Sequence, residues 1–204
     1  MCAHYFAYTE KDLIEIRLII EEWNQMIFKP VLLATDHVRP ANVSPVITKD
    51  GLQPMKWGFP SPTGKGINLH ARSETAAEKP MFKEAFSSRR CAISTTGFIE
   101  FGEAKDQLSL FEQPAPTKKK PKKDGYIFTL PDTPVFHMAG LYNPFTVDGV
   151  TIPHFVVMTM GANRSVIEIH DRMPVILLGN ETSEWLEKGT LPGIAPLFEN
   201  KKIA

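Results

Sequence analysis

The residue that follows the initiator Met1 is Cys2, and its chemistry at this position is unusual. An aminopeptidase is expected to remove Met1, because the side chain after it is small. The chain would then begin with an amine of pKa about 8 beside a thiol of pKa about 8.5. Such a pair condenses with an aldehyde, because the amine forms an imine and the thiolate closes a thiazolidine ring. The alternative is that a cysteine at this position has no function.

Two further side chains have the properties of proton-transfer groups. His170 lies in a polar run between apolar residues, which is typical of a loop that reaches a pocket, and its imidazole exchanges protons near pH 7. Glu100 lies between Ile99 and Phe101, so partial burial would raise its pKa and make it a general acid. The alternatives are a structural histidine bonded to backbone and an exposed acid at a strand edge.

Three features suit contact with nucleic acid. Arg72, at the start of the polar run Arg72-Ser73-Glu74-Thr75, could hold a phosphate through two hydrogen bonds, or the run could begin a capped helix. Trp57 precedes Gly58, so its ring could stack on an unpaired base from a turn or lie in the core. Residues 103–124 are rich in Pro and hold five Lys between 118 and 123, which indicates a mobile loop that could attract phosphate or simply be solvated.

Composition narrows the classes of protein. The 204 residues hold 23 basic and 23 acidic side chains, so overall charge cannot drive nucleic-acid binding, although a local basic groove can. Two cysteines cannot build a disulfide framework or a Cys-only zinc site, and no phosphate-cradling Gly loop is present. No secretory signal and no apolar run long enough to span a membrane is seen. We therefore expect a cytoplasmic protein with no cofactor, no metal and no membrane contact.

Many short elements must position these residues, since 17 Pro and 13 Gly favour turns and a β-rich fold. Apolar spacing predicts four helices, two hairpins and five further strands. The helix predicted over 75–88 is interrupted at Pro80. The predicted helices cover 9–26, 75–88, 163–169 and 182–187, the hairpins 43–59 and 147–150, and the strands 89–101, 126–130, 134–142, 154–159 and 173–178, with an irregular tail from 191.

The chain resembles the SRAP (SOS-response-associated peptidase) family from Met1-Cys2 to Pro174. No single motif is specific, but their joint occurrence in order is. They are Met1-Cys2, Arg39-Pro40 before Pro45-Val46-Ile47, Trp57-Gly58, Ala71-Arg72-Ser73-Glu74-Thr75, Lys79-Pro80-Met81-Phe82, Arg89-Arg90-Cys91, Gly97-Phe98-Ile99-Glu100, Ala139-Gly140-Leu141-Tyr142 and Ile169-His170-Asp171-Arg172-Met173-Pro174.

The resemblance implies an α+β fold, with one domain over 1–204, a β-rich barrel-like core and peripheral helices. It also implies an enzyme of the DNA damage and SOS response that shields abasic sites in single-stranded DNA. In that activity the amino-terminal Cys2 forms a covalent thiazolidine crosslink with the ring-opened abasic sugar. Removal of Met1 can be autocatalytic, and the protein is expected to be a monomer that can work beside the replication machinery.

On this basis we assign catalytic roles as a hypothesis about the mechanism. Cys2 is the nucleophile, His170 opens the sugar ring, and Glu100 shuttles protons while the imine and the thiazolidine form. The family commonly has Asn where this chain has His70, and Asn68 lies two residues earlier. On a strand these two side chains point the same way, so either could orient the α-amine.

A second set of residues is expected to bind DNA without reading its sequence, since phosphate and stacking contacts carry little sequence information. Arg72 and Arg172 would hold phosphates, Trp57 would stack a base, and Arg39 belongs to the same set. His4 also belongs to it and stands where the family usually has Arg.

Three alternatives remain open from the sequence. The first is a thiol peptidase with Cys2 as nucleophile and His170 as base, and the second is a module that binds single-stranded DNA without a covalent bond. The third and weakest is a metal site built from His4, His70 and His170.

Overall fold

The structure is a computed structural model that describes residues 4–6, 37–103, 123–147 and 149–203. Cys2, the helix predicted over 9–26 and most of the Lys-rich segment 103–124 lie outside these residues. Among the described residues, no helix combines the length and the apolar character needed to cross a membrane. The prediction of a single domain over the whole chain stays a prediction.

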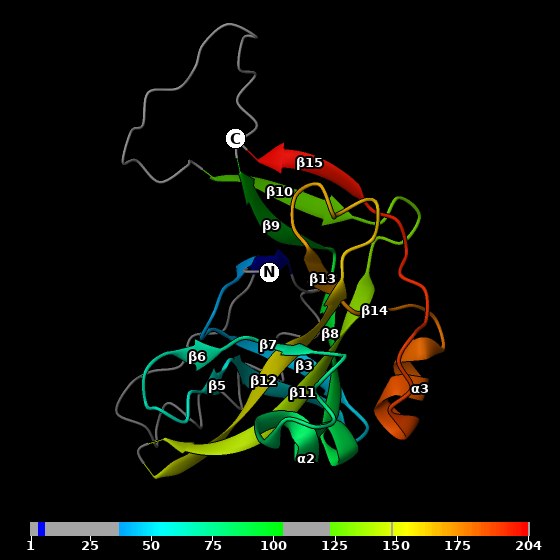
Figure 1. Cartoon of the computed structure of the whole chain (residues 1–204). Coiled ribbons are helices and arrows are strands. Elements are labelled where there is room, and N and C mark those ends of the chain that lie inside the picture. Colours follow the sequence, from blue (N-terminus) through cyan, green and yellow to red (C-terminus); the bar gives the residue numbers. More distant parts are fainter. Residues whose placement is uncertain (1–3, 7–36, 104–122, 148, 204) are drawn as a thin grey trace, which may run out of the picture.

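Five strands close into a ring that forms the centre of the fold (Figure 1). Their order around the ring is β12-β4-β3-β8-β11, and β11 pairs with β12 to close it. The strands are β3 (Val43–Thr48), β4 (Gly51–Trp57), β8 (Arg90–Thr95), β11 (Phe136–Val147) and β12 (Val150–Gly161). With helices outside this ring, the predicted α+β fold and its barrel-like core are confirmed.

A second sheet joins the ring where the chain passes from β8 into β9 (Figure 1). Its order is β15-β10-β9-β1-β2, so β9 lies between β10 and the strand nearest the amino terminus. The strands are β1 (His4–Phe6), β2 (His37–Val38), β9 (Gly97–Glu103), β10 (Lys123–Thr129) and β15 (Glu199–Ile203). The irregular tail predicted from residue 191 was wrong at its end, because β15 pairs with β10 in register from Glu199 to Ile203.

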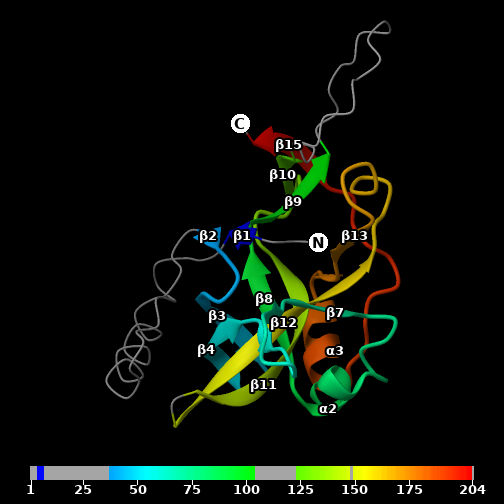
Figure 2. The same ribbon diagram turned by 60° about the vertical axis from the view of Figure 1, so that its left-hand side comes forward.

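Shorter elements surround the ring (Figure 2). β7 and β13 lie on either side of the carboxyl half of β12, and each pairs with it. These elements are β5 (Phe59–Pro60), β6 (Ile67–Asn68), β7 (His70–Arg72), β13 (Arg172–Pro174), β14 (Ile176–Leu177), α2 (Pro80–Ser88) and α3 (Glu181–Lys188).

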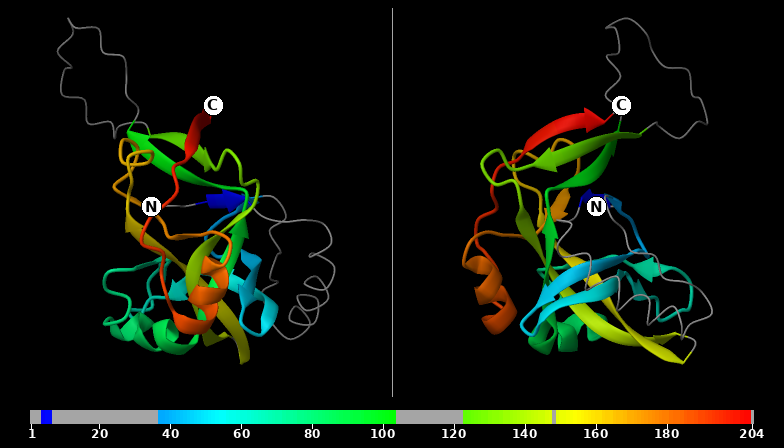
Figure 3. Two further views of the ribbon diagram at one scale, coloured as in Figure 1. Left: turned by 90° about the vertical axis from the view of Figure 1, so that its right-hand side faces the viewer. Right: turned by 180° about the vertical axis from the view of Figure 1, so that it is seen from behind.

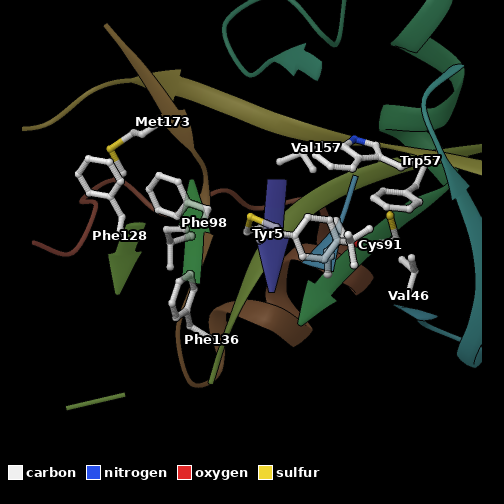
Figure 4. Packing of buried hydrophobic residues seen from close by; sticks show 14 of the residues in the cluster. Tyr5, Val46, Trp57, Cys91, Phe98, Phe128, Phe136, Val157 and Met173 are labelled. Atoms are coloured by element: carbon white, nitrogen blue, oxygen red, sulfur yellow. The ribbon is translucent and has the colours of Figure 1, made fainter. Parts of the chain in front are cut away.

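Two buried clusters lie on the two faces of β8, because successive side chains of a strand point to opposite faces. Cys91 and Ile93 face the cluster of the ring interior, where aromatic rings from several strands pack (Figure 4). Ala92 faces the other cluster, which includes Trp185 of α3 and lies under the helices seen in Figure 3. The indole N–H of Trp185 donates to the carbonyl of Cys91 over 2.9 Å, so this buried donor has an acceptor.

Most of the local predictions were confirmed. The hairpin over 43–59 forms with Thr48 opposite Gly51, and Val147 pairs with Val150 across the second predicted turn. Pro80 begins α2 and does not interrupt a longer helix, because Pro fits the first helical position, where no intrahelical N–H bond is needed. The helix predicted over 163–169 was wrong, since this segment forms turns.

The closed ring leaves no room for a side chain at Gly140 of β11. A Cβ there would lie 2.5 Å from Ile93 Cδ1 and 2.9 Å from the backbone oxygen of Val156. Since that oxygen cannot move without disturbing the strands, Gly140→Ala should lower the free energy of unfolding by about 1–3 kcal/mol in urea titration. Gly161→Ala is the control, because no described atom lies within 4 Å of its Cβ. Equal stability of the two variants would contradict the ring packing.

Candidate active site

Glu100 is an acid in the middle of β9, where only 1% of its surface is exposed. It lies opposite Tyr126 of β10 in the sheet. Burial raises the pKa of its carboxyl to about 7, and the negative charge of Asp171 acts in the same direction. The half-buried general acid expected from Ile99 and Phe101 is therefore a buried one, protonated in about half of the molecules at neutral pH.

The turn that carries His170 packs directly against β9. A Cβ at Gly102 would lie only 3.1 Å from the backbone oxygen of Ile169. Glu100 and Gly102 point to the same face of β9, because they are two residues apart. The close approach at Gly102 therefore brings the two predicted proton-transfer residues, Glu100 and His170, onto neighbouring backbone segments.

The ring of His170 has two competing contacts at Nδ1. The backbone N–H of Arg172 donates to this nitrogen over 3.0 Å, and the Asp171 carboxylate oxygen lies 2.9 Å from it. Burial lowers the pKa of the imidazole, which favours the neutral ring. When Nδ1 accepts the Arg172 bond, the proton of the neutral ring is on Nε2, and when Nδ1 donates to Asp171, Nε2 is an acceptor.

His4 lies on β1 next to β9, opposite Ile99. Its ring contacts His37 and Phe101 edge-on, with centroids 5.0 and 5.8 Å apart. Burial lowers the pKa of His4, and the charges of His37 and exposed Arg39 lower it further. His4 is therefore mostly uncharged at neutral pH.

A cleft of about 850 Å³ holds the second group of predicted residues. Asn68, His70 and Arg72 all line it. Arg72 is exposed, and Lys79 adds a second cation at the wall. The remaining lining is apolar and consists of Pro62, Ile67, Leu69, Pro80, Met81 and Phe82.

The expectation that Trp57 stacks a DNA base is corrected by the structure. Its side chain is 0% exposed, with Phe155 stacked on it at 6.1 Å and Tyr5 edge-on at 5.2 Å. Its indole N–H donates to the carbonyl of Leu69 over 3.1 Å, and His70 meets the ring edge-on at 6.2 Å. The alternative of a core tryptophan is the one observed, and this ring places β1 relative to His70.

Arg172, the second predicted phosphate ligand, is engaged within the chain. Its guanidinium donates to both carboxylate oxygens of Glu74, over 2.6 and 2.9 Å, and to the carbonyl of Thr159 over 2.6 Å. Sequence reasoning missed this role of Glu74, which is 98 residues away in the chain. The polar run after Arg72 was the only signal for it, and it did not indicate a partner.

The weakest alternative, a metal site, finds no support in the part of the chain that the structure describes. No group of three or more His, Cys, Asp or Glu side chains there is arranged to hold a metal ion.

The family described as SOS response associated peptidase (SRAP) matches this sequence over residues 1–199. The chain belongs to the SRAP family.

Curated SRAP relatives from bacteria and vertebrates carry the name abasic site processing protein. YobE of Bacillus subtilis (strain 168) is 30% identical over 205 residues, which cover 94% of this chain and 85% of YobE. HMCES of Xenopus tropicalis is 29% identical over 179 residues, covering 80% of this chain and 52% of HMCES. YedK of Escherichia coli (strain K12) is 29% identical over 138 residues, covering 67% of this chain and 55% of YedK.

Solved structures share the SRAP fold seen in this chain. A protein from Bacteroides thetaiotaomicron superposes with a TM-score of 0.72 at 23% identity, covering 100% of this chain and 92% of its own. A protein from Bordetella bronchiseptica gives a TM-score of 0.72 at 20% identity and covers 100% of both chains. At these identities the likeness concerns the fold.

The buried acid of this SRAP chain predicts a pH-dependent stability. The pKa of Glu100 is about 7 in the folded chain, above its usual 4.5, so the favourable contribution is complete below pH 4.5 and is lost as pH rises through 7. Between pH 4.5 and 8 the wild-type chain should lose about 3 kcal/mol more unfolding free energy than Glu100→Gln does. Denaturant titration at both pH values measures this difference, and parallel losses would mean that Glu100 is not protonated by burial.

Proposed function

We propose that this chain binds single-stranded DNA containing an abasic site and joins Cys2 covalently to the ring-opened sugar as a thiazolidine. The observation that carries the proposal is the buried Glu100, whose pKa of about 7 lets it both give and take a proton at neutral pH. The names of YobE, YedK and HMCES, all abasic site processing proteins, support the choice of substrate.

Chain connectivity supports the part assigned to Cys2, which lies outside the described residues. Consecutive Cα atoms are about 3.8 Å apart, so the Cα of Cys2 lies within about 8 Å of the Cα of His4. His4 is paired with Ile99, the residue directly before Glu100. The proposal accordingly requires the amino-terminal thiol and amine to reach the β9 acid after Met1 is removed.

Glu100 fits the two proton transfers of the condensation. The α-amine adds to the aldehyde carbon, and the resulting hydroxyl leaves as water with the proton of the Glu100 carboxyl. The product of this step is a protonated imine. The thiol adds to its carbon, so a C–S bond forms, the thiol proton goes to the Glu100 carboxylate, and the C=N electron pair returns to the nitrogen, which keeps its one proton. The balance is aldehyde plus amine plus thiol giving thiazolidine plus one water, with Glu100 regenerated.

His170 fits the preceding step, in which the closed hemiacetal opens. Opening removes a proton from the sugar hydroxyl and delivers one to the ring oxygen. The two contacts at Nδ1, from the Arg172 N–H and to the Asp171 carboxylate, correspond to rings whose Nε2 gives or accepts a proton. His70 and Asn68, on the cleft wall, are the candidates to orient the α-amine.

Non-specific phosphate contacts fit the exposed cations beside these residues. Arg72 lines the cleft and Arg39 is exposed next to His4. Because neutral His4 replaces the family's usual Arg, the DNA affinity of this chain depends more heavily on Arg72. Arg172 would bind phosphate only by giving up part of its contact with Glu74.

Crosslinking to an abasic oligonucleotide tests the proposal. Wild-type protein mixed with a single-stranded oligonucleotide carrying one abasic site should give an adduct that survives denaturing electrophoresis, and Cys2→Ala should abolish it. Cys91→Ala is the matched control, because burial raises the pKa of this thiol well above its usual value and keeps it unreactive. Intact mass spectrometry checks that Met1 is absent and that the adduct has lost one water.

Other outcomes of that experiment select the alternatives. A full yield of stable adduct from Cys2→Ala would favour a Lys Schiff base over the thiazolidine. Tight binding with no adduct from the wild-type chain would favour the non-covalent module. Cleavage of added peptides that depends on Cys2 and His170 would favour the thiol peptidase. That the protein acts beside the replication machinery stays a prediction.

Arg72 should contribute to DNA affinity through phosphate. Arg72→Gln should weaken binding of undamaged single-stranded DNA for all sequences and reduce the slope of log affinity against log salt by about 1. Lys49→Gln is the control, since Lys49 is an exposed cation at the β3–β4 turn, outside the cleft. Fluorescence anisotropy over a salt series measures both slopes, and equal slopes for Arg72→Gln and wild type would remove Arg72 from the DNA contacts.

A further inference from the structure

The carboxylate of Glu74 connects the segment that carries the cleft residues Asn68, His70 and Arg72 with the segment that carries His170. Glu74 follows β7 by two residues and binds the Arg172 guanidinium through both of its oxygens. The Arg172 hydrogen bonds hold the pKa of Glu74 at about 2, so the carboxylate is ionised at any physiological pH. The Arg172 side chain is 13% exposed and that of Glu74 is 51% exposed, and the two parallel hydrogen bonds make the pair more specific in geometry than a single-contact surface salt bridge.

The strand arrangement explains what the pair connects. β12 lies between β7 and β13, with Thr159 opposite Arg72 on one side and Gly161 opposite Arg172 on the other. The carbonyl of Thr159 accepts from the Arg172 guanidinium over 2.6 Å and from the backbone N–H of Ser73 over 2.8 Å. The guanidinium therefore crosses β12 and fastens the segment after the cleft residues to the segment after His170.

Arg172 in turn determines a hydrogen bond of His170. Its backbone N–H donates to His170 Nδ1 over 3.0 Å, and this bond requires the neutral ring to carry its proton on Nε2. The competing contact with the Asp171 carboxylate, 2.9 Å from the same nitrogen, requires the proton on Nδ1. Any shift of the Arg172 backbone away from His170 favours the Asp171 arrangement.

We propose that Glu74 is a positioning residue for the crosslinking reaction, which holds Arg172 so that its backbone N–H fixes the orientation and the proton position of His170. The inference rests on the proposed function for its chemical readout. The Glu74 side chain is hydrogen-bonded to Arg172 and Ser73, and in this proposal it acts on His170 through Arg172.

Glu74→Gln tests this role with one atom changed and one charge lost. The first-order rate constant of adduct formation at saturating protein should fall about tenfold, since a misplaced acid–base group forfeits part of its usual contribution. Affinity for undamaged single-stranded DNA should not fall, because the released guanidinium becomes available to phosphate. Glu74→Asp, which keeps the charge, should recover part of the rate.

Glu78→Gln is the matched control. Glu78 is an exposed acid four residues further along the same segment, and it makes none of the Arg172 contacts described above. The control removes the same charge from the same chain segment, so it separates general electrostatics from the pairing with Arg172. The rate constant and the DNA affinity of Glu78→Gln should match those of the wild type within about twofold, an interval typical of distant surface substitutions.

Nitrogen-15 spectra of the His170 ring give a readout that does not depend on the adduct. The neutral wild-type ring should carry its proton on Nε2, and Glu74→Gln should shift it toward Nδ1. Unchanged ring spectra with an unchanged rate in Glu74→Gln, or equal effects in Glu74→Gln and Glu78→Gln, would overturn the positioning role. If Glu74→Gln does not fold, Glu74→Asp is compared with wild type, and its shorter side chain should give a smaller fall in rate with a ring shift in the same direction.

These outcomes are distinct from failure of the proposed function. If wild-type protein forms no adduct, the proposed function fails, while the ring spectra still show whether Glu74 controls His170. If wild-type protein forms the adduct and Glu74→Gln does so at the same rate with the same ring spectra, the proposed function stands and only the role of Glu74 is refuted.

Discussion

The burial of one carboxyl group, that of Glu100, sets the chemistry available to this fold. A carboxylate in water is ionised at neutral pH, whereas the side chain on β9 is 1% exposed and has a pKa of about 7. That environment requires neighbours on every side. β1 and β10 flank β9 in the sheet, and the turn at Ile169 packs against Gly102 on the face that Glu100 shares. The second sheet thus does more than extend the ring, because its strands shield Glu100 on β9 from water.

The core reaches the candidate active site through Trp57. This indole contacts Tyr5 of β1 on one edge and His70 of β7 on another, and it binds the carbonyl of Leu69. A base-stacking residue needs an exposed face, which a fully buried ring does not have. Trp57 therefore acts as a spacer that fixes the amino-terminal strand relative to the cleft wall, and a packing change there would be felt at both.

The sequence predicted those features that depend on residues close together in the chain. Ile99 and Phe101 beside Glu100 indicated its burial, because the burial of a strand residue depends on its immediate neighbours. The sequence could not decide whether Trp57 was buried, since the strands that cover it come from distant segments. It also gave no sign that residues near 200 would form β15, because all five of its side chains are exposed and only the partner strand β10 gives that segment its structure.

Arg172 shows why residue type alone does not assign a role. A guanidinium in a family motif suggests phosphate binding, yet here both ends of its fork bind Glu74 and one nitrogen also binds Thr159. A phosphate would have to compete with a carboxylate already held by two charge-assisted hydrogen bonds, whereas exposed Arg72 has no such competitor among the described contacts. Arginines one strand apart can therefore divide the work, with one facing the solvent where a nucleic acid would lie and the other holding the histidine. This difference follows from the position of Glu74, which binds the Arg172 guanidinium and leaves that of Arg72 in the cleft.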